Sequence, residues 1–319
     1  MKDQQVLLAQ AIQDQINRIF VGKEDVVRLL LTCFLAGGHL LIEDVPGVGK
    51  TTLASCLAKA IQCTFGRIQF TPDTLPGDVT GISVYNMKTG EFAFRKGVVD
   101  HQILLADEIN RTSPKTQSSL LEAMAERQVT IDGVTYPLPT PFMVIATQNP
   151  VEFLGTYPLP EAQMDRFLMR LSIGYPDQQE EIRMTQQFLQ GLTKEQLSAV
   201  CDADQIVSLQ EVVKNVTMQE DIIRYISDII SLTRKEERFL IGASPRAMLA
   251  LASAAQANAF LAGRQYCKPD DVKKMALPVL CHRLFLTAEA RMKQESIEAI
   301  LKSIVLKAKV PILSESAGK

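Results

Sequence analysis

The chain has 319 residues, which is more than one hydrophobic core usually needs, so we expect two packed domains. Its 46% hydrophobic and 22% charged residues exclude an extensively disordered protein, and a net charge of -2 gives no overall field that would draw the chain onto nucleic acid or an anionic membrane. No apolar stretch reaches the roughly 20 residues of a membrane span, and the first residues have no secretory pattern, so we expect a cytoplasmic protein without membrane insertion.

The first half of the chain alternates short apolar runs with helical stretches. Between about residues 15 and 175 this alternation is typical of a parallel sheet with helices on its faces. Continuous apolar runs at 39–43, 103–106 and 142–147 predict strands that are buried on both faces. Ligands of such sheets gather at the carboxyl ends of the strands, so the polar residues that end these runs are candidate site residues.

A glycine-rich loop follows the first run. Residues 45–52 read VPGVGKTT, directly after HLLIE and before the helical stretch TTLASCLAKAI. In a Walker A loop, glycines let successive N–H groups curl around phosphate, the lysine reaches the β and γ phosphates, and the next hydroxyl ligates magnesium. A chance glycine-rich turn before a helix is the alternative. The candidate ATP-binding residues of this loop are Pro46, Gly47, Val48, Gly49, Lys50, Thr51 and Thr52, with Thr51 also a magnesium ligand.

One position departs from the full Walker A pattern. The pattern would have glycine at position 44, where this chain has Asp44. Because that position lies at the edge of the loop, we expect the phosphate-facing amides from Gly47 to Lys50 to be unaffected.

Two segments interrupt the alternation and predict β-hairpins. Residues 82–98 read ISVYNMKTGEFAFRKGV, with a Lys88-Thr89-Gly90 turn between alternating stretches. Residues 128–136 read QVTIDGVTY, where Asp132-Gly133 between β-branched residues is a strong signal for a type I′ turn.

Two of the predicted strands end in candidate catalytic side chains. The run ILLADE at 103–108 has the Walker B arrangement, in which Asp107 holds magnesium, usually through water, and Glu108 orients and polarises the attacking water. A plain solvated turn is the alternative. The next run, FMVIATQNP, ends at Asn149, whose amide can bridge the γ phosphate and that water, the sensor 1 role. A simple Asn149-Pro150 turn is the competing interpretation.

Helical periodicity takes over after Pro176. A linker helix is predicted at about 178–191, a second helix starts with Ser244 as N-cap and stops near Gly263, and a third starts at 269–271 and should be kinked or interrupted at Pro278. We therefore expect an α/β nucleotide-binding domain at 1–176, a linker helix at 177–196 and an all-helical lid domain at 197–319.

Three arginines are candidates for contacts with the phosphates. Arg166 is expected on a short helix that begins near Pro160, from which it could project into a neighbouring subunit's nucleotide, or simply form an ion pair with Glu161 or Asp165. Arg111, just past the Walker B run, is a weaker candidate for the same role. Arg246 lies in the first turn of the helix capped by Ser244, where a cation opposes the helix dipole, and a bound phosphate would explain its presence as a sensor 2 residue.

These motifs resemble those of the MoxR branch of the AAA+ ATPases. The resemblance runs from about residue 15 to residue 309, and the acidic residue at position 44 is similar to the family's pattern. The matching stretches are IFVGKEDVV, LIEDVPGVGKTTLA, RIQFTPDTLPGDVTG, LLADEINRTSPKTQSSLLEAMAERQVTIDG, VIATQNPVEFLGTYPLPEAQMDRFLM and GASPRA.

The resemblance implies more than the spacing does. It implies that Val21 and Gly22 lie near the adenine of ATP, and that both hairpins face the central pore of a ring. Family members act as hexameric, chaperone-like ATPases that remodel or activate other proteins, often with a partner that carries a von Willebrand factor A domain. In several relatives the arginine corresponding to Arg246 acts on a neighbour's nucleotide, so the subunit it serves here stays open.

Three functions compete for this chain. An ATP-driven protein remodeller ranks first, a chelatase-like subunit that powers metal insertion second, and a nucleic-acid motor third. The cations Lys88, Arg95 and Lys96 near one hairpin turn could touch phosphates, but charge on an exposed hairpin edge more often protects it from pairing. No dedicated nucleic-acid module is visible, so no nucleic-acid partner is expected.

Overall fold

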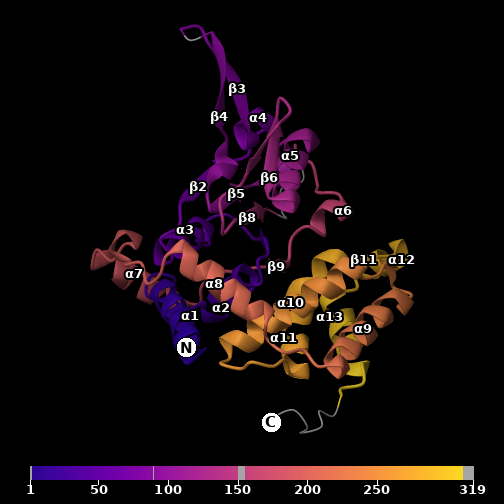
Figure 1. Cartoon of the computed structure of the whole chain (residues 1–319). Coiled ribbons are helices and arrows are strands. Elements are labelled where there is room, and N and C mark those ends of the chain that lie inside the picture. Colours follow the sequence, from indigo (N-terminus) through magenta and orange to yellow (C-terminus); the bar gives the residue numbers. More distant parts are fainter. Residues whose placement is uncertain (1, 89, 150–154, 312–319) are drawn as a thin grey trace.

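A parallel sheet forms the centre of the first half of the chain. The computed structural model describes residues 2–88, 90–149 and 155–311. Five parallel strands pair in the order β2-β5-β8-β1-β9 (Figure 1). They are β1 Leu40–Glu43, β2 Phe65–Gln69, β5 Ile103–Asp107, β8 Met143–Gln148 and β9 Met169–Leu171. The three strands predicted from apolar runs, β1, β5 and β8, are confirmed and are the three inner strands. The edge strands β2 and β9 escaped prediction because each has a polar residue at its centre, Arg67 and Arg170.

Alternate residues of the inner strands enter two separate hydrophobic cores. Leu41 and Leu104 pack with helices α4 and α5 on one face of the sheet. Leu40 and Leu105 pack with α1, α2 and α3 on the other face. The helices of this half are α1 Lys2–Asn17, α2 Glu24–Leu35, α3 Lys50–Ala60, α4 Pro76–Thr80, α5 Pro114–Glu126 and α6 Glu161–Met164, with 3-10 turns η1 Val98–Asp100 and η2 Ile109–Arg111. The predicted sheet with helices on both faces is therefore confirmed.

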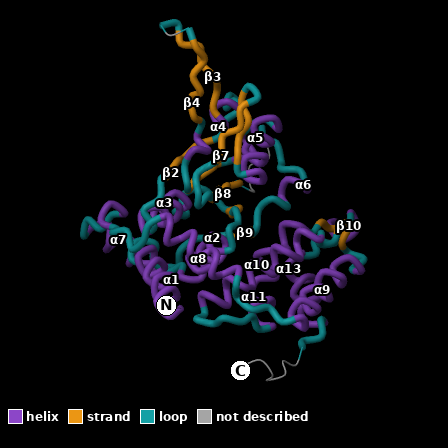
Figure 2. Tube along the Cα trace, viewed as in Figure 1, coloured by secondary structure: helices purple, strands orange, loops and turns teal. Residues whose placement is uncertain are grey.

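Both predicted hairpins are present. The first pairs β3 Gly81–Asn86 with β4 Glu91–Lys96 and projects from the body of the molecule (Figures 1 and 2). The second pairs β6 Gln128–Ile131 with β7 Val134–Pro137, and Asp132 and Gly133 have φ of +50° and +80°, as a type I′ turn requires. Phe94 stacks on Tyr136 with ring centroids 4.1 Å apart, so the two hairpins are in contact. Thr89 of the predicted first turn lies outside the described residues.

The remainder of the chain is helical, as predicted, with one small sheet added. Its elements are α7 Gln178–Leu189, α8 Ala203–Lys214, α9 Glu220–Lys235, α10 Pro245–Leu261, α11 Pro269–Leu280, α12 Ala288–Met292 and α13 Ile297–Lys307, the 3-10 turns η3 Lys194–Gln196 and η4 Cys281–Arg283, and the antiparallel strands β10 Phe239–Ile241 and β11 Phe285–Leu286. These strands are too short for their periodicity to be visible in the sequence. Ser244 caps α10, and Pro278 lies in the last turn of α11, which ends at Leu280.

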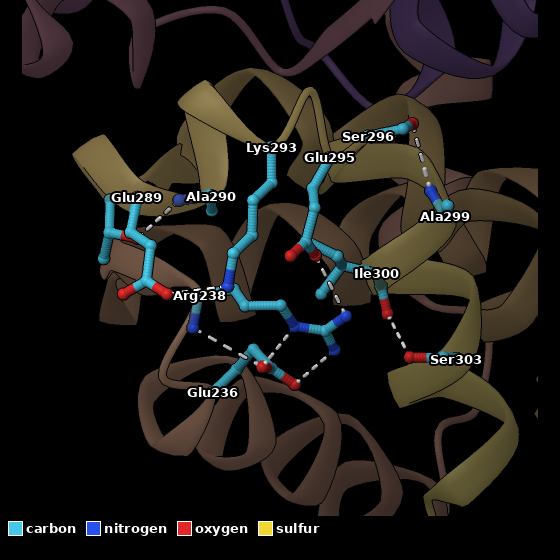
Figure 3. Close-up of polar contacts among 11 residues, drawn as sticks. Glu236, Arg238, Glu289, Ala290, Lys293, Glu295, Ser296, Ala299, Ile300 and Ser303 are labelled. Atoms are coloured by element: carbon cyan, nitrogen blue, oxygen red, sulfur yellow. Dashed lines mark hydrogen bonds and ion pairs between the residues drawn. The ribbon is translucent and has the colours of Figure 1, made fainter.

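A cluster of ion pairs holds the far end of the lid together. Arg238 donates from Nε and Nη2 to the two carboxylate oxygens of Glu236 at 2.7 and 3.0 Å, and from Nη1 to Glu295 at 3.2 Å (Figure 3). These contacts join the start of β10 to the segment between α12 and α13. The lid also shares a hydrophobic core with α1, α2 and α3, so the two halves of the chain are packed together. Among the described residues, no helix has the length and apolar character needed to span a membrane.

Candidate functional site

The glycine-rich loop joins β1 to α3 at the carboxyl edge of the sheet. Gly47 and Gly49 have φ of +87° and +93°, a left-handed conformation that glycine adopts at little cost. A Cβ atom on Gly49 would also approach the Phe20 ring to 3.0 Å. Gly49 precedes the first residue of α3, so the loop leads directly to a helix amino terminus. Such a terminus, with its unpaired N–H groups and positive dipole end, is suited to bind phosphate.

Lys50 lies half-buried beneath this loop. Its Nζ donates to the backbone carbonyl of Asp44 at 2.6 Å. Burial lowers the pKa of the Lys50 ammonium from its ordinary value, while the nearby carboxylates of Asp107, Asp44 and Glu108 act in the opposite direction. The Lys50 ammonium therefore lies near three carboxylates, as expected of a cation shared by the Walker A and Walker B motifs.

Asp44 is the residue that departs from the Walker A pattern, and its side chain anchors the loop. It is buried, and its Oδ2 accepts hydrogen bonds from the backbone N–H groups of Ile173 at 2.6 Å and Gly174 at 2.8 Å and from Ser172 Oγ at 3.0 Å. The carboxylate thereby ties the start of the loop to the segment after β9. This contact could not be predicted from the sequence, because the partners are about 130 residues away along the chain.

Asp44→Ala is expected to lower the free energy of unfolding by about 2 kcal/mol, because the buried N–H of Ile173 and the half-buried N–H of Gly174 lose a charged acceptor. Urea denaturation measures this change. Asp228→Ala is the matched control, since Asp228 lies exposed on α9 and should change stability by no more than about 0.5 kcal/mol. Equal stability of the two variants would contradict the anchoring role of Asp44.

The Walker B carboxylates lie at the end of β5, beside the loop. Asp107 Oδ1 accepts from Thr147 Oγ1 at 2.6 Å, and Asp107 Oδ2 accepts from Arg67 Nη2 at 2.8 Å. Thr147 Oγ1 also accepts the backbone N–H of Glu108 at 2.9 Å. The hydroxyl of Thr147 on β8 therefore fixes both Walker B residues.

The carboxylate of Glu108 is held by two further side chains. Its Oε2 accepts from Gln69 Nε2 at 2.7 Å and pairs with Arg111 Nε at 3.0 Å. Glu108 itself has φ of +56°, a conformation that is uncommon for a residue other than glycine and that costs on the order of 1–3 kcal/mol. The structure thus pairs Arg111, a candidate for contact with a neighbouring subunit, with Glu108 of its own chain.

Three more candidates lie apart from one another, and only Asn149 is at the carboxyl edge of the sheet, because Arg166 precedes β9 and Arg246 is on the lid. Asn149 is buried directly after β8, the strand next to β5. Arg166 lies just past α6, and its Nη1 donates to the Leu121 carbonyl at 2.6 Å. The alternative ion pair of Arg166 with Glu161 or Asp165 does not form among the described residues. Arg246 is exposed in the first turn of α10 and has no ion pair within the described part of the chain. Pro150, on which the competing turn interpretation of Asn149 depends, lies outside the described residues.

A cavity of about 220 Å³ lies beside the glycine-rich loop. Its lining is largely apolar and includes Val21, Val48, Ile173, Pro176 and Met184, together with Gly47, Gly49 and Thr52. Gly22, with φ of +81°, directly follows Val21. An apolar cavity next to a phosphate-binding loop suits a purine ring.

The residues at this edge of the sheet fit a magnesium nucleotide. The loop offers backbone donors and the Lys50 ammonium to phosphates, and the cavity offers space for a base. The Thr51 hydroxyl and the Asp107 carboxylate are oxygen ligands of the kind Mg²⁺ prefers. Arg67, Gln69 and Thr147 were missed from the sequence, although β2 and β8 bring them to the Walker B carboxylates.

Comparison with known proteins gives a consistent picture. A family model described as the ATPase family associated with various cellular activities (AAA) matches residues 39–169, and an AAA lid domain model matches residues 231–304. The chain is 50% identical to the uncharacterised protein YeaC of Bacillus subtilis, covering 98% of this chain and 97% of YeaC. It is 40% identical to chaperone MoxR1 of Mycobacterium tuberculosis, covering 93% of this chain and 81% of that protein. A crystal structure from Cytophaga hutchinsonii aligns with a TM-score of 0.91 at 37% identity, covering 98% and 97% of the two chains.

Proposed function

Because the chain belongs to the MoxR family of AAA+ ATPases, we propose that it uses ATP hydrolysis to remodel or activate a partner protein. The chain binds nucleotide and hydrolyses ATP, as its AAA ATPase domain implies. The further proposal is that it does so as a homo-hexamer, on a protein client, together with a partner carrying a von Willebrand factor A domain. A relative named as a chaperone supports the client proposal. The cytoplasmic location stays a prediction.

We propose the following roles for the site residues. The loop amides and Lys50 bind the phosphates, and Thr51 and Asp107 would hold Mg²⁺. When bound, Mg²⁺ neutralises negative charge on the phosphates. Glu108 orients and polarises the attacking water, and its carboxylate must leave the Gln69 and Arg111 contacts, or share them, to reach that water.

The remaining candidates would act around the transferred phosphate. Asn149 would lie between the γ phosphate and the water. Arg246, which lies on the lid, would contact a phosphate of the nucleotide. Val21 and Gly22 would contact the adenine at the cavity beside the loop. Arg166 would act on the nucleotide of a neighbouring subunit. Arg166 is half-buried, and among the described residues the only partner of its guanidinium is the Leu121 carbonyl, bonded through Nη1, so Nη2 can reach outward.

The single observation that favours a protein client is the surface of the β3–β4 hairpin. Met87 and Phe92 are 91% and 71% exposed, and Tyr85 packs against Phe92 with ring centroids 5.2 Å apart. Of the cations on this hairpin, Lys96 is already paired with Asp100 at 2.8 Å. A projecting apolar surface suits the grip of exposed polypeptide, whereas neutralising several phosphates would need clustered, unpaired cations.

The proposal predicts that ATP turnover rises with a protein partner and does not rise with nucleic acid. The measurement is steady-state ATP hydrolysis at low salt with single-stranded DNA, duplex DNA, RNA or the product of the adjacent gene. Phe92→Ala is expected to reduce the ratio of stimulated to basal rate. Phe188→Ala, at a similarly exposed phenylalanine on α7, should leave that ratio unchanged. Strong stimulation by nucleic acid that weakens in Lys96→Glu would overturn the proposal in favour of a motor on nucleic acid.

A further inference from the structure

A buried arginine of the lid grips the segment that carries Arg166. The Arg283 side chain is 3% exposed and lies at the end of η4. Its Nε donates to Asp165 Oδ1 at 2.6 Å, and its two Nη groups donate to the backbone carbonyls of Phe167 at 2.7 Å and Leu168 at 3.2 Å. Arg283 therefore holds both the side chain before Arg166 and the backbone after it.

Two other lid residues bind the same segment. Ser244 Oγ donates to the second carboxylate oxygen of Asp165 at 3.2 Å, and the same Ser244 oxygen accepts the Ala247 N–H that caps α10. The Nε2 of His282 is 2.9 Å from the Phe167 carbonyl. Each oxygen of the Asp165 carboxylate thus has a partner in the lid, although Asp165 itself follows α6 of the nucleotide-binding half.

The position of Ser244 links this contact to the other candidate arginine. Ser244 is the N-cap of α10, and Arg246 lies in the first turn that it starts. Burial is the main cause that lowers the pKa of the Arg283 guanidinium, and Asp165 acts in the opposite direction. The Arg246 charge is close enough to lower this pKa further. The connection therefore runs from Arg246 through Pro245 to Ser244, across the Ser244–Asp165 hydrogen bond, and on to Arg166.

The energetics make this junction rigid. A guanidinium stays charged when it is buried, so removing its partner leaves an uncompensated buried charge, which typically costs about 3–5 kcal/mol. Because the Asp165–Leu168 backbone is bonded to the lid at several points, a movement of the lid must either carry Arg166 with it or break these bonds.

We propose that Asp165, Arg283 and Ser244 form a clamp that couples the position of the lid to the orientation of Arg166. Through it, nucleotide contacts made by the lid in one subunit set the arginine that the subunit presents to its neighbour. Asp165 is a positioning residue that touches no substrate. The clamp rests on the proposed role of Arg166 between subunits, and it adds a route by which neighbouring sites become cooperative.

The first test is Asp165→Asn, which keeps the shape of the side chain and removes its charge. Nucleotide affinity should stay near that of the unaltered protein, kcat should fall on the order of 10²-fold because the arginine is misplaced, and the Hill coefficient for ATP should fall to about 1. Asp165→Glu, which restores the charge, should recover part of the kcat and part of the Hill coefficient. Arg238→Ala is the matched control, because it breaks a lid ion pair that does not reach the nucleotide-binding half (Figure 3).

A second measurement does not depend on activity. Hydrogen exchange of residues 161–171 is compared with and without ATP in Glu108→Gln rings, with Asp165 intact or changed to Asn. ATP should alter protection of this segment only when Asp165 is intact. If Asp165→Asn does not fold, Ser244→Ala takes its place. Because Ser244→Ala also removes the α10 cap, Ser296→Ala, which removes the α13 cap, is its control.

Three results decide between the proposals. Unchanged kcat, Hill coefficient and exchange in a folded clamp variant would overturn the clamp, as would losses equal to those of the control variant. If Arg166→Ala does not impair ATP hydrolysis at a neighbouring subunit's site, the proposed role of Arg166 between subunits fails, and the clamp fails with it. If Arg166→Ala acts between subunits while the clamp variants behave normally, only the clamp fails.

Discussion

Lys50→Ala is expected to abolish ATP binding. The Lys50 ammonium is the only lysine charge within the glycine-rich loop, and it lies near the Asp107, Asp44 and Glu108 carboxylates, so its loss removes the attraction for phosphate and leaves net negative charge at the site. Isothermal titration calorimetry with ATP and Mg²⁺ measures the change. Lys59→Ala is the control, because Lys59 lies at the far end of α3 and should bind ATP normally.

Glu108→Gln should behave differently from Lys50→Ala. Its amide keeps the shape of the carboxylate but cannot polarise water, so binding should persist while hydrolysis falls by about 10² to 10⁴. The two measurements separate the proposed roles, since Lys50 is proposed to contact phosphate and Glu108 only water. A loss of nucleotide affinity in Glu108→Gln as severe as in Lys50→Ala would show that the roles are assigned wrongly.

Arg166→Ala should bind ATP almost normally and hydrolyse it poorly. Arginines supplied to the γ phosphate of P-loop enzymes contribute about 10³ to 10⁵ in rate. In this chain the Arg166 side chain contacts the carbonyl of Leu121 and no described residue of the glycine-rich loop. This position is consistent with action on the nucleotide of a neighbouring subunit. Steady-state ATP turnover measures the hydrolysis rate, and isothermal titration calorimetry measures the affinity for ATP.

Mixing tests whether Arg166 acts across a boundary. Arg166→Ala subunits retain an intact loop, and Lys50→Ala subunits retain an intact Arg166, so a mixed interface can combine the two. Mixtures that are shown to co-assemble should recover part of the activity. Complete absence of recovery in such mixtures would contradict action between subunits.

The motifs were predictable from the sequence because they are local. The glycine-rich loop sits between an apolar run and a helix, and Asp107 and Glu108 end another apolar run, so spacing alone places them at one edge of a parallel sheet. The hairpin at Asp132-Gly133 was likewise visible because a type I′ turn needs two residues with positive φ.

The supporting contacts were not predictable, because they depend on which strands and domains become neighbours. Gln69 reaches Glu108 only because β2 lies beside β5, and Thr147 reaches Asp107 only because β8 lies on the other side. Arg283 and Asp165 are 118 residues apart and meet where the lid packs on the sheet domain. A charged residue at position 283 looks like an ordinary surface residue until the fold buries it.

The most direct test of the account is a cryo-EM map of Glu108→Gln assembled with ATP and Mg²⁺. We expect a ring in which the triphosphate lies on the loop amides and Lys50, Thr51 and Asp107 face the metal, and the Arg166 guanidinium of each subunit is within hydrogen-bonding distance of the γ phosphate bound to the next. Nucleotide bound elsewhere, or Arg166 still on the Leu121 carbonyl and remote from every γ phosphate in an assembled ring, would contradict it.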